Sequence, residues 1–256
     1  MIRFMGILCL FVVVGLGASG CVMSVTPPPM SFSKFARSEN SGQARTASAP
    51  ASAADRGKVG VSTGAAFLID DDKEDSGGSP NLGVVLFPVE GAWTSWLADF
   101  YDLTASIHVN GQLGIEGNIR MLQRSKVSLC FIHGVNLGFF ADDITEDDWT
   151  GYFTYGFSPG LFFQVRTTDR STLFIGGKYT YASYAELNND EDYRTFGHFG
   201  TGSVGALFHI GRLLVAPEIV VSFERQIVRP DEGSDLEPDT DNIIFILPGL
   251  TLAAAY

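Results

Sequence analysis

Apolar and polar residues alternate along most of this chain with the period of two that half-buried β-strands show. The alternation begins at Lys58 and is clearest in the segments 112–122, 151–166 and 212–225. The apolar side of these segments consists of Leu113, Ile115, Ile119, Met121, Phe153, Tyr155, Phe157, Leu161, Phe163, Val165, Leu213, Val215, Ile219, Val221 and Phe223. No stretch keeps the 3.6-residue period of a long helix, so the pattern predicts an all-β fold.

Ten segments carry the alternation and are separated by Gly, Asn, Asp or clusters of charge. They are 58–69, 82–97, 102–109, 112–123, 126–140, 151–166, 172–184, 198–210, 212–226 and 242–256. Pro88 and Gly91 predict a bulge in the second segment, because proline cannot donate to a strand ladder. We therefore expect about ten strands, with eight or twelve as the alternatives.

The connections between these segments are alternately long and short. The short turns are 98–101, 124–125, 167–171 and Gly211, whereas the long connections are 70–81, 141–150, 185–197 and 227–241, and Asn110-Gly111 forms one further tight turn. Long connections on one rim and short turns on the other are typical of transmembrane β-barrels. An even strand count places both ends of the barrel on the short-turn side.

The composition of the polar face indicates which face meets lipid. A soluble barrel covers its outer face with Lys, Glu and Arg, but here the polar face is mostly Gly, Ser, Thr, Asn and Gln. Small polar residues suit a narrow lumen, and the face rich in Phe, Leu, Ile and Val suits lipid. We predict a closed antiparallel transmembrane β-barrel, closed because unpaired backbone groups in hydrocarbon are costly. A soluble lipocalin-like binder, with the two faces exchanged, is the alternative.

Aromatic residues gather where the strands would leave the membrane. Trp93, Trp96, Phe100 and Tyr101 surround the first short turn. A second group flanks the long connections and consists of Phe139, Phe140, Trp149, Tyr152, Phe153, Tyr181, Tyr184, Tyr193, Phe196 and Phe199. Trp and Tyr concentrate at both membrane–water boundaries, so these groups are expected to form two girdles.

The first twenty residues have the layout of a secretory signal peptide. Arg3 supplies a positive charge, residues 5–16 are apolar, and Ala18-Ser19-Gly20 supply small side chains. The apolar run is shorter than the roughly 20 residues that span a bilayer. The sequence Ala18-Ser19-Gly20-Cys21 resembles the lipobox of bacterial lipoproteins, with Ala18 where that family favours Leu. The resemblance implies cleavage before Cys21 and its acylation with fatty acids such as palmitate; secretion with an unmodified Cys21 is the alternative.

The next stretch, 21–57, is rich in Pro, Ser, Ala and Gly and has no sustained period. This composition predicts a disordered periplasmic linker. We therefore expect a signal peptide over 1–20, a linker with a lipidated first residue over 21–57, and a barrel over 58–256.

The last segment, 242–256, ends on an aromatic residue, Tyr256, after a regular apolar alternation. This ending resembles the terminal signature read by the outer-membrane barrel assembly machinery. With the turn at Asp99 to Leu103, residues 58–256 resemble the small outer-membrane barrels of Gram-negative bacteria. The resemblance implies a place in the bacterial outer membrane, with its lipids and lipopolysaccharide as neighbours and the assembly machinery as a partner during biogenesis.

Composition narrows the function classes. Only 18% of residues are charged, below the roughly 25% of soluble domains. A formal charge of −12 excludes a nucleic-acid partner, which needs a basic surface. Cys9, Cys21 and Cys130 stand at unrelated positions, which excludes a disulfide scaffold and a cysteine-rich metal site. We expect no cofactor, and we expect Cys130 to be a buried, inert thiol.

Acidic residues gather in the four long connections, which hold 20 of the 29 acids. Oxygen-rich clusters are the ligands that Ca²⁺ and Mg²⁺ prefer, so weak binding of divalent cations by these loops is one hypothesis. The other is a solvated, mutually repelling acidic rim displayed outward.

Charged residues on the polar face are the candidate site residues. The predicted lumen-lining set is Glu116, Arg120, Lys178, Glu218 and Glu224. Isolated charges in a narrow barrel are costly, so we expect these side chains to pair and to fill the lumen. The alternative is a narrow pore whose charges set selectivity.

One cluster near the outer rim, His198 with Thr201 and Ser203, has the residue types of a hydrolase. A general base must lie within hydrogen-bond reach of its nucleophile, but alternation puts His198 and Ser203 on opposite faces. His108 near the rim acids is a second candidate, and His133 falls on the apolar face. We predict a non-enzymatic, lipid-anchored outer-membrane barrel with a structural or surface-interaction role; a rim-located hydrolase and a narrow pore are the alternatives.

Overall fold

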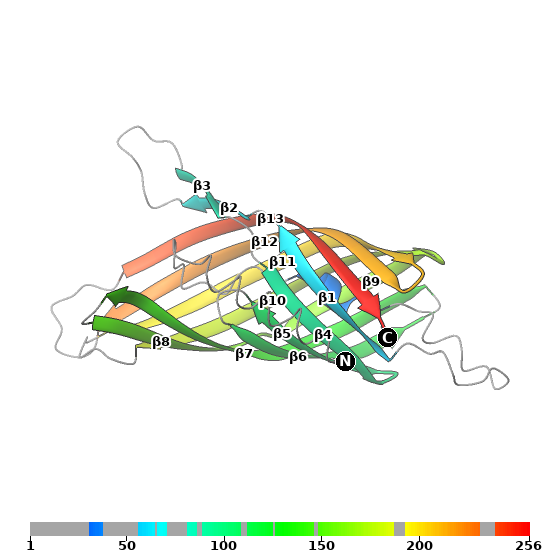
Figure 1. Ribbon diagram of the computed structural model, residues 1–256, viewed down its shortest axis with the longest axis horizontal. Coiled ribbons are helices and arrows are strands. Elements are labelled where there is room, and N and C mark those ends of the chain that lie inside the picture. Colours follow the sequence, from blue (N-terminus) through cyan, green and yellow to red (C-terminus); the bar gives the residue numbers. More distant parts are fainter. Residues whose placement is uncertain are drawn as a thin grey trace.

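The strands of this chain form one antiparallel sheet that closes into a barrel (Figure 1). The computed structural model describes residues 31–37, 56–64, 66–70, 81–85, 89–108, 112–124, 126–145, 148–186, 193–230 and 239–256. The strands are β1 (Gly57–Gly64), β2 (Ala66–Asp70), β3 (Asn81–Val85), β4 (Val89–Ala98), β5 (Tyr101–His108), β6 (Leu113–Gln123), β7 (Val127–Thr145), β8 (Asp148–Phe157), β9 (Gly160–Thr168), β10 (Ser171–Glu186), β11 (Tyr193–Ile210), β12 (Leu213–Pro230) and β13 (Asp239–Ala255). A short 3₁₀ helix, η1 (Ser33–Phe35), precedes them.

The barrel closes at β1, which pairs with β4 on one side and with β13 on the other. At one level, Val59 is the register partner of both Trp93 and Ala254. β8 and β9 occupy one position between β7 and β10, separated by Ser158 and Pro159. The wall therefore has ten strand positions, which confirms the predicted closed antiparallel barrel.

The first predicted strand, 58–69, continues through β1 and β2. β2 pairs with β13 over Ile243 to Ile246 in the same register that β1 keeps over Gly249 to Ala255, and it also pairs with β3; residue 65 between them lies outside the described residues. The β2–β3 pair extends this part of the wall and is seen at the upper left of Figure 1. The bulge predicted at Pro88 lies in 86–88, outside the described residues.

Connections of two or three residues join β4 to β5, β6 to β7, β9 to β10 and β11 to β12 at the barrel end where the chain terminates (Figure 1, right). We call this the short-turn end. Gly211 has a φ of +65°, a left-handed conformation that a side chain disfavours, so glycine suits the tight β11–β12 turn.

At the opposite end the strands run further than predicted. β7 and β8 continue their ladder through the pair Asp142–Thr150, so most of the predicted connection 141–150 is a hairpin. Acidic side chains do not prevent this pairing, because the ladder uses backbone groups alone. The remaining parts of the acidic connections, 71–80, 146–147, 187–192 and 231–238, lie outside the described residues, as does their predicted binding of divalent cations.

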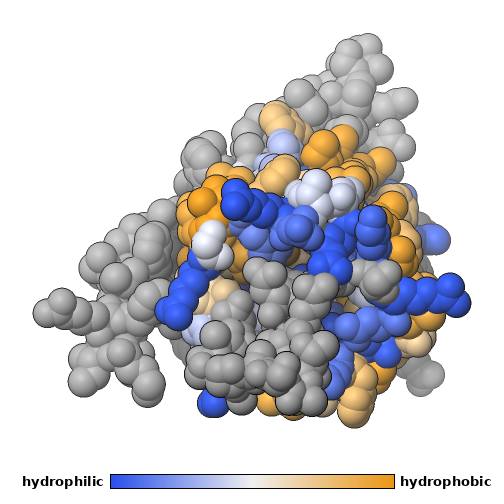
Figure 2. Space-filling view, turned by 90° about the vertical axis from the view of Figure 1, so that its right-hand side faces the viewer, coloured by the Kyte–Doolittle hydropathy of each residue, from blue (hydrophilic) through white to orange (hydrophobic). Residues whose placement is uncertain are grey.

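The two faces of the wall have opposite chemistry, as the alternation predicts. Phe157, Leu161 and Ile219 on the outer face are each 50–53% exposed, whereas Glu116 and Glu218 on the inner face are 0% and 5% exposed. Hydrophobic residues surround a more hydrophilic centre when the barrel is viewed from the short-turn end (Figure 2). An apolar band around a closed sheet is the surface that a membrane requires.

Within the described residues, no helix has the length and apolar character needed to cross a membrane.

Candidate functional site: the plugged lumen

Residues 31–37 lie inside the barrel, and we call them the plug. Residues 31–36 are buried, and Phe32 is fully enclosed. The amide of Phe35 donates to the carbonyl of Phe32 (3.0 Å) and the amide of Ala36 to that of Ser33 (3.1 Å), which forms the η1 turn. These seven residues fall within the predicted disordered linker 21–57, and the structure corrects that prediction for them.

The remainder of the predicted signal peptide and linker, 1–30 and 38–55, lies outside the described residues. Cys21 is among them, so its predicted acylation stays a prediction.

Lys34 anchors the plug through two buried carboxylates. Its Nζ atom lies 2.7 Å from Glu90 Oε1 and 2.5 Å from Glu116 Oε2. Burial lowers the pKa of this ammonium, but Glu116 and Glu90 raise the pKa by more, so the net pKa lies above its usual value. Glu116 also accepts from Lys178 of β10 at 3.0 Å, so one carboxylate binds two cations, one at each oxygen.

Two other contacts bind the backbone of the plug to lumen carboxylates. Glu218 of β12 accepts from the amide of Phe32 (3.0 Å) and from the hydroxyl of Ser31, and Ser203 also donates to it (3.1 Å). Glu90 accepts from the amide of Ser31 (3.0 Å). The lumen carboxylates therefore bind backbone amides of the plug as well as the ammonium group of Lys34.

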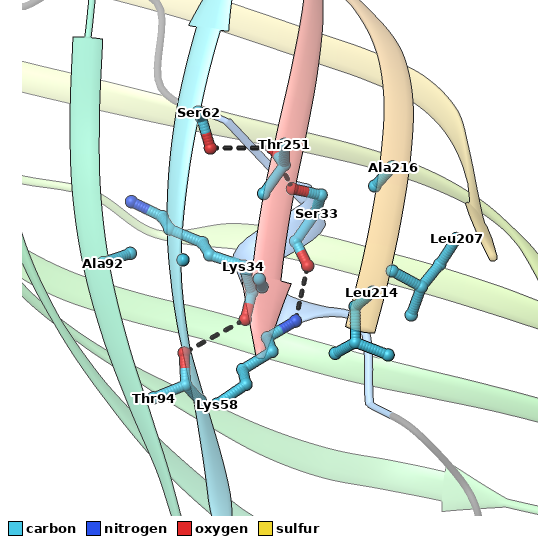
Figure 3. A pocket seen from close by; sticks show the side chains of 12 residues that line it. Ser33, Lys34, Lys58, Ser62, Ala92, Thr94, Leu207, Leu214, Ala216 and Thr251 are labelled. Atoms are coloured by element: carbon cyan, nitrogen blue, oxygen red, sulfur yellow. Dashed lines mark hydrogen bonds between the residues drawn. The ribbon is translucent and has the colours of Figure 1, made fainter. Parts of the chain in front are cut away.

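Lys58 of β1 supplies donors to the plug's carbonyl groups (Figure 3). Its Nζ donates to the carbonyl oxygens of Ser33 (2.6 Å) and Ala36, and Thr94 donates to the carbonyl of Lys34 (3.2 Å). A cavity of about 10 Å³ remains beside these groups, and one of about 20 Å³ lies between Ser31, the β4 wall and the β12 wall. A single water needs about 10–15 Å³, so the described residues leave room only for single waters here.

An apolar patch on the inner wall receives the plug's two aromatic rings. The Phe32 and Phe35 rings meet edge to face with centroids 6.0 Å apart, and Phe35 meets Phe162 of β9 at 6.1 Å. The complete cluster is Phe32, Phe35, Ala36, Cys130, Ile132, Phe162, Phe174, Leu207, Leu214, Ala216, Ala253 and Ala255. Apolar residues at inward positions, against the general alternation, therefore mark the part of the wall that binds the plug.

Gly176 of β10 makes room for the Phe32 ring. A Cβ atom at this position would lie 2.4 Å from Phe32 Cδ1 and 3.1 Å from Phe162 Cδ2, closer than van der Waals contact allows. The glycine is therefore part of the plug's binding surface.

Replacing Gly176 with Leu is expected to expel Phe32 while the strands stay paired, because the clash falls on the plug and on one side chain of the wall. The measurement is limited proteolysis of the folded barrel, with cleavage after Lys34 or Arg37 expected to become faster. Gly177→Leu is the matched control, since a Cβ there meets only Thr201 O, at 3.7 Å. Equal protection of both variants would contradict the role given to Gly176.

Arg37 occupies the short-turn end of the lumen. Its guanidinium carbon lies 4.9 Å from the centre of the Trp96 ring, and Nη1 lies 4.0 Å from Asp102 Oδ1. Trp96 was expected in the short-turn girdle with Trp93, but it contacts the plug, because Trp93 and Trp96 differ in parity and only Trp93 faces outward.

The five predicted lumen residues all point inward. Glu116, Glu218 and Glu224 are buried, Lys178 pairs with Glu116, and Arg120 donates to Asp102 (2.9 Å). Sequence reasoning missed Glu90, Asp102, Lys58, Lys34 and Arg37. Glu90 falls in a weakly alternating segment, Asp102 and Lys58 stand at strand ends, and the two plug cations precede the first strand, so periodicity gave no signal for them.

The plug balances the formal charge of the buried side chains that the structure describes in the lumen. The buried carboxylates of the described residues are Glu90, Asp102, Glu116, Glu218 and Glu224. The cationic side chains that contact these carboxylates or the plug are Lys34, Arg37, Lys58, Arg120 and Lys178. The two sets are equal in number with the plug in place, and without its two cations the carboxylates exceed the cations by two.

The candidate hydrolase residues are not brought together. His198 Nδ1 lies 2.5 Å from the Tyr179 hydroxyl on the outer face, whereas Thr201 and Ser203 point into the lumen. His108 is buried with Nε2 at 3.8 Å from Glu90, and His133 stacks on the outer face between Tyr101 and Phe131. Cys130 is a buried free thiol. Across the described ranges, no three His, Cys, Asp or Glu residues are placed to hold a metal ion.

A closed ten-position barrel with an apolar outer band and a filled, charged lumen defines a membrane-spanning β-barrel protein. No family model matches the sequence, and no curated protein sequence matches it significantly.

Three similar solved structures have low sequence identity to this chain. The outer membrane protease OmpT of Escherichia coli is 9% identical with a TM-score of 0.47, over 79% of this chain and 97% of that chain. Neisserial surface protein A is 7% identical with a TM-score of 0.34, over 77% and 97%. The attachment invasion locus protein Ail of Yersinia pestis is 12% identical with a TM-score of 0.29, over 77% and 99%. Such values carry no inference about activity or ligand.

Proposed function

We propose that this chain is a lipid-anchored protein of the bacterial outer membrane, with a structural or surface-interaction role rather than a catalytic one. This role is supported by one observation: charged side chains of the lumen bind the plug and so are not free to act on a substrate. They are Glu90, Glu116, Glu218 and Lys58. Their polar chemistry holds a segment of the same chain and fills the barrel. The strand ends that flank the acidic connections lie at the opposite end of the barrel from the short turns.

The proposed partners are the lipids of that membrane, including lipopolysaccharide, and the barrel assembly machinery during biogenesis. An apolar hollow of about 510 Å³ on the outer wall supports the first, with Val61, Trp93, Leu213 and Leu252 among its lining residues. Its chemistry suits the acyl chains of lipids. The aromatic end of the last strand, Tyr256, supports the second.

The proposed location and anchor are tested in cells that export the full chain. We expect the protein in the outer-membrane fraction, resistant to carbonate extraction, with faster gel migration before boiling than after it. A soluble binder would instead leave the membrane in carbonate or high salt, and that result would overturn the proposal.

Replacing Cys21 with Ser is expected to abolish incorporation of a labelled palmitate analogue, because the thiol is the proposed acylation site. Cys130→Ser is the matched control and should keep the label, since Cys130 is buried in the wall. The readout is label per unit of protein after membrane isolation. Label that persists in the Cys21→Ser chain would remove the anchor from the proposal.

A further inference from the structure

We propose that the plug is a displaceable closure and that the barrel conducts small cations when the plug leaves. This inference goes beyond the proposed structural role, and it concerns the lumen alone.

The wall does not depend on the plug for its backbone hydrogen bonds. The strands on both sides of the plug are paired with each other: β1 with β4 and with β13, and β12 with β13. The plug's backbone amides and carbonyls at Ser31, Phe32 and Ser33 bond instead to side chains of Glu90, Glu218 and Lys58. Its departure therefore breaks side-chain contacts and leaves the ladder of the barrel intact.

The contacts that hold the plug are exchangeable. Carboxylates that lose amide and ammonium donors can take up water and hydrated cations, which enter the space that seven residues vacate. The two aromatic rings, by contrast, leave an apolar patch that water wets poorly. The closed state is therefore favoured, and opening is a minor state of the same fold.

The emptied lumen has an excess of negative charge. With Lys34 and Arg37 gone, five buried carboxylates face three buried cations, Lys58, Arg120 and Lys178. Glu90 and Glu116 lose the ammonium they share, while Glu116 keeps Lys178. Charged side chains that line a narrow pore set the sign of the ions it passes, so this lumen selects cations.

The plug is a short peptide in which one cation, Lys34, stands between two aromatic residues, Phe32 and Phe35. The same site should therefore accept a free peptide with the sequence of residues 29–38, PMSFSKFARS. A peptide in which Glu replaces Lys34 should not bind, because a third carboxylate would then meet Glu90 and Glu116 with Lys178 as their one ammonium partner.

The experiment compares single-channel currents in planar bilayers for the full chain and for a full-length variant with residues 31–37 replaced by Gly and Ser. The variant is expected to raise the open fraction at least about tenfold, with a reversal potential in a KCl gradient that has the sign of cation flow. Adding the 29–38 peptide should close it, and the Lys34→Glu peptide should not. A folded variant that stays closed, or that prefers anions, would overturn the proposal.

A second measurement applies even if that variant does not fold. In the full chain with Ser33→Cys, a membrane-impermeant thiol reagent is expected to label both position 33 and the native wall thiol Cys130, which lies in the patch that the plug covers, because the plug samples an exposed state. Protection of both thiols from the reagent would contradict displacement. Gel mobility before and after boiling reports insertion separately, so failure here is distinct from failure of the proposed membrane location.

Discussion

Replacing Glu116 with Gln is expected to lower the free energy of unfolding of the barrel by about 3–5 kcal/mol, the cost of removing one partner from a buried ionic group. Glu116 is fully buried and lies between Lys34 at 2.5 Å and Lys178 at 3.0 Å. The neutral amide leaves the two buried ammonium groups with one carboxylate partner, Glu90, which contacts Lys34. Urea titration in lipid vesicles, followed by the gel mobility of unboiled samples, gives the free energy.

The matched control adds Lys178→Met to Glu116→Gln, which removes one unpaired cation and keeps the length of the side chain. This double variant is expected to recover about half of the lost free energy, since Lys34 keeps Glu90. A single Glu116→Gln variant as stable as the native chain would show that the buried triad does not hold the lumen together.

Replacing Ile219 with Arg is expected to cost about 2–4 kcal/mol of stability in a bilayer, the cost of a cation at the midplane of a membrane barrel. Ile219 lies on the outer face of β12, six residues from its short-turn end, and is 50% exposed. The guanidinium would stand in hydrocarbon without an ionic partner. The same urea titration in vesicles measures the loss.

Ile210→Arg is the control for depth. Ile210 is the last residue of β11, at the short-turn rim, and is 65% exposed. A cation near the interface costs only about 0–1 kcal/mol, because it reaches water and lipid headgroups. Equal costs at the two positions would mean that the band around Ile219 does not face acyl chains.

The strand pattern could be predicted because lipid and lumen impose opposite chemistry on alternate residues. Phe157 and Ile219 face outward and Glu116 and Glu218 inward, as their parity alone indicates. The division of β8 from β9 at Ser158 and Pro159 does not change which residues face outward. The alternation therefore could not predict this division.

The plug could not be predicted by the same reasoning. Ser31 to Arg37 has no period of its own, and its partners Glu90, Glu116 and Glu218 come from strands far apart in the sequence. The available signals were two aromatic residues in a linker that otherwise lacks them, and inward-facing apolar residues such as Phe162. Neither signal predicts a plug by itself. The contact between the linker's aromatic residues and the inward apolar residues becomes evident only once the strands are placed around the lumen.

The plug's partners stand on both sides of the seam where the first strand meets the last. Lys58 belongs to β1 and Thr251 to β13, and both bond to Ser33. The surface that binds the plug is therefore incomplete until β13, the last strand of the chain, has joined the wall. Occupation of the lumen should consequently be a late event of biogenesis, and it would distinguish finished barrels from those still open at the seam.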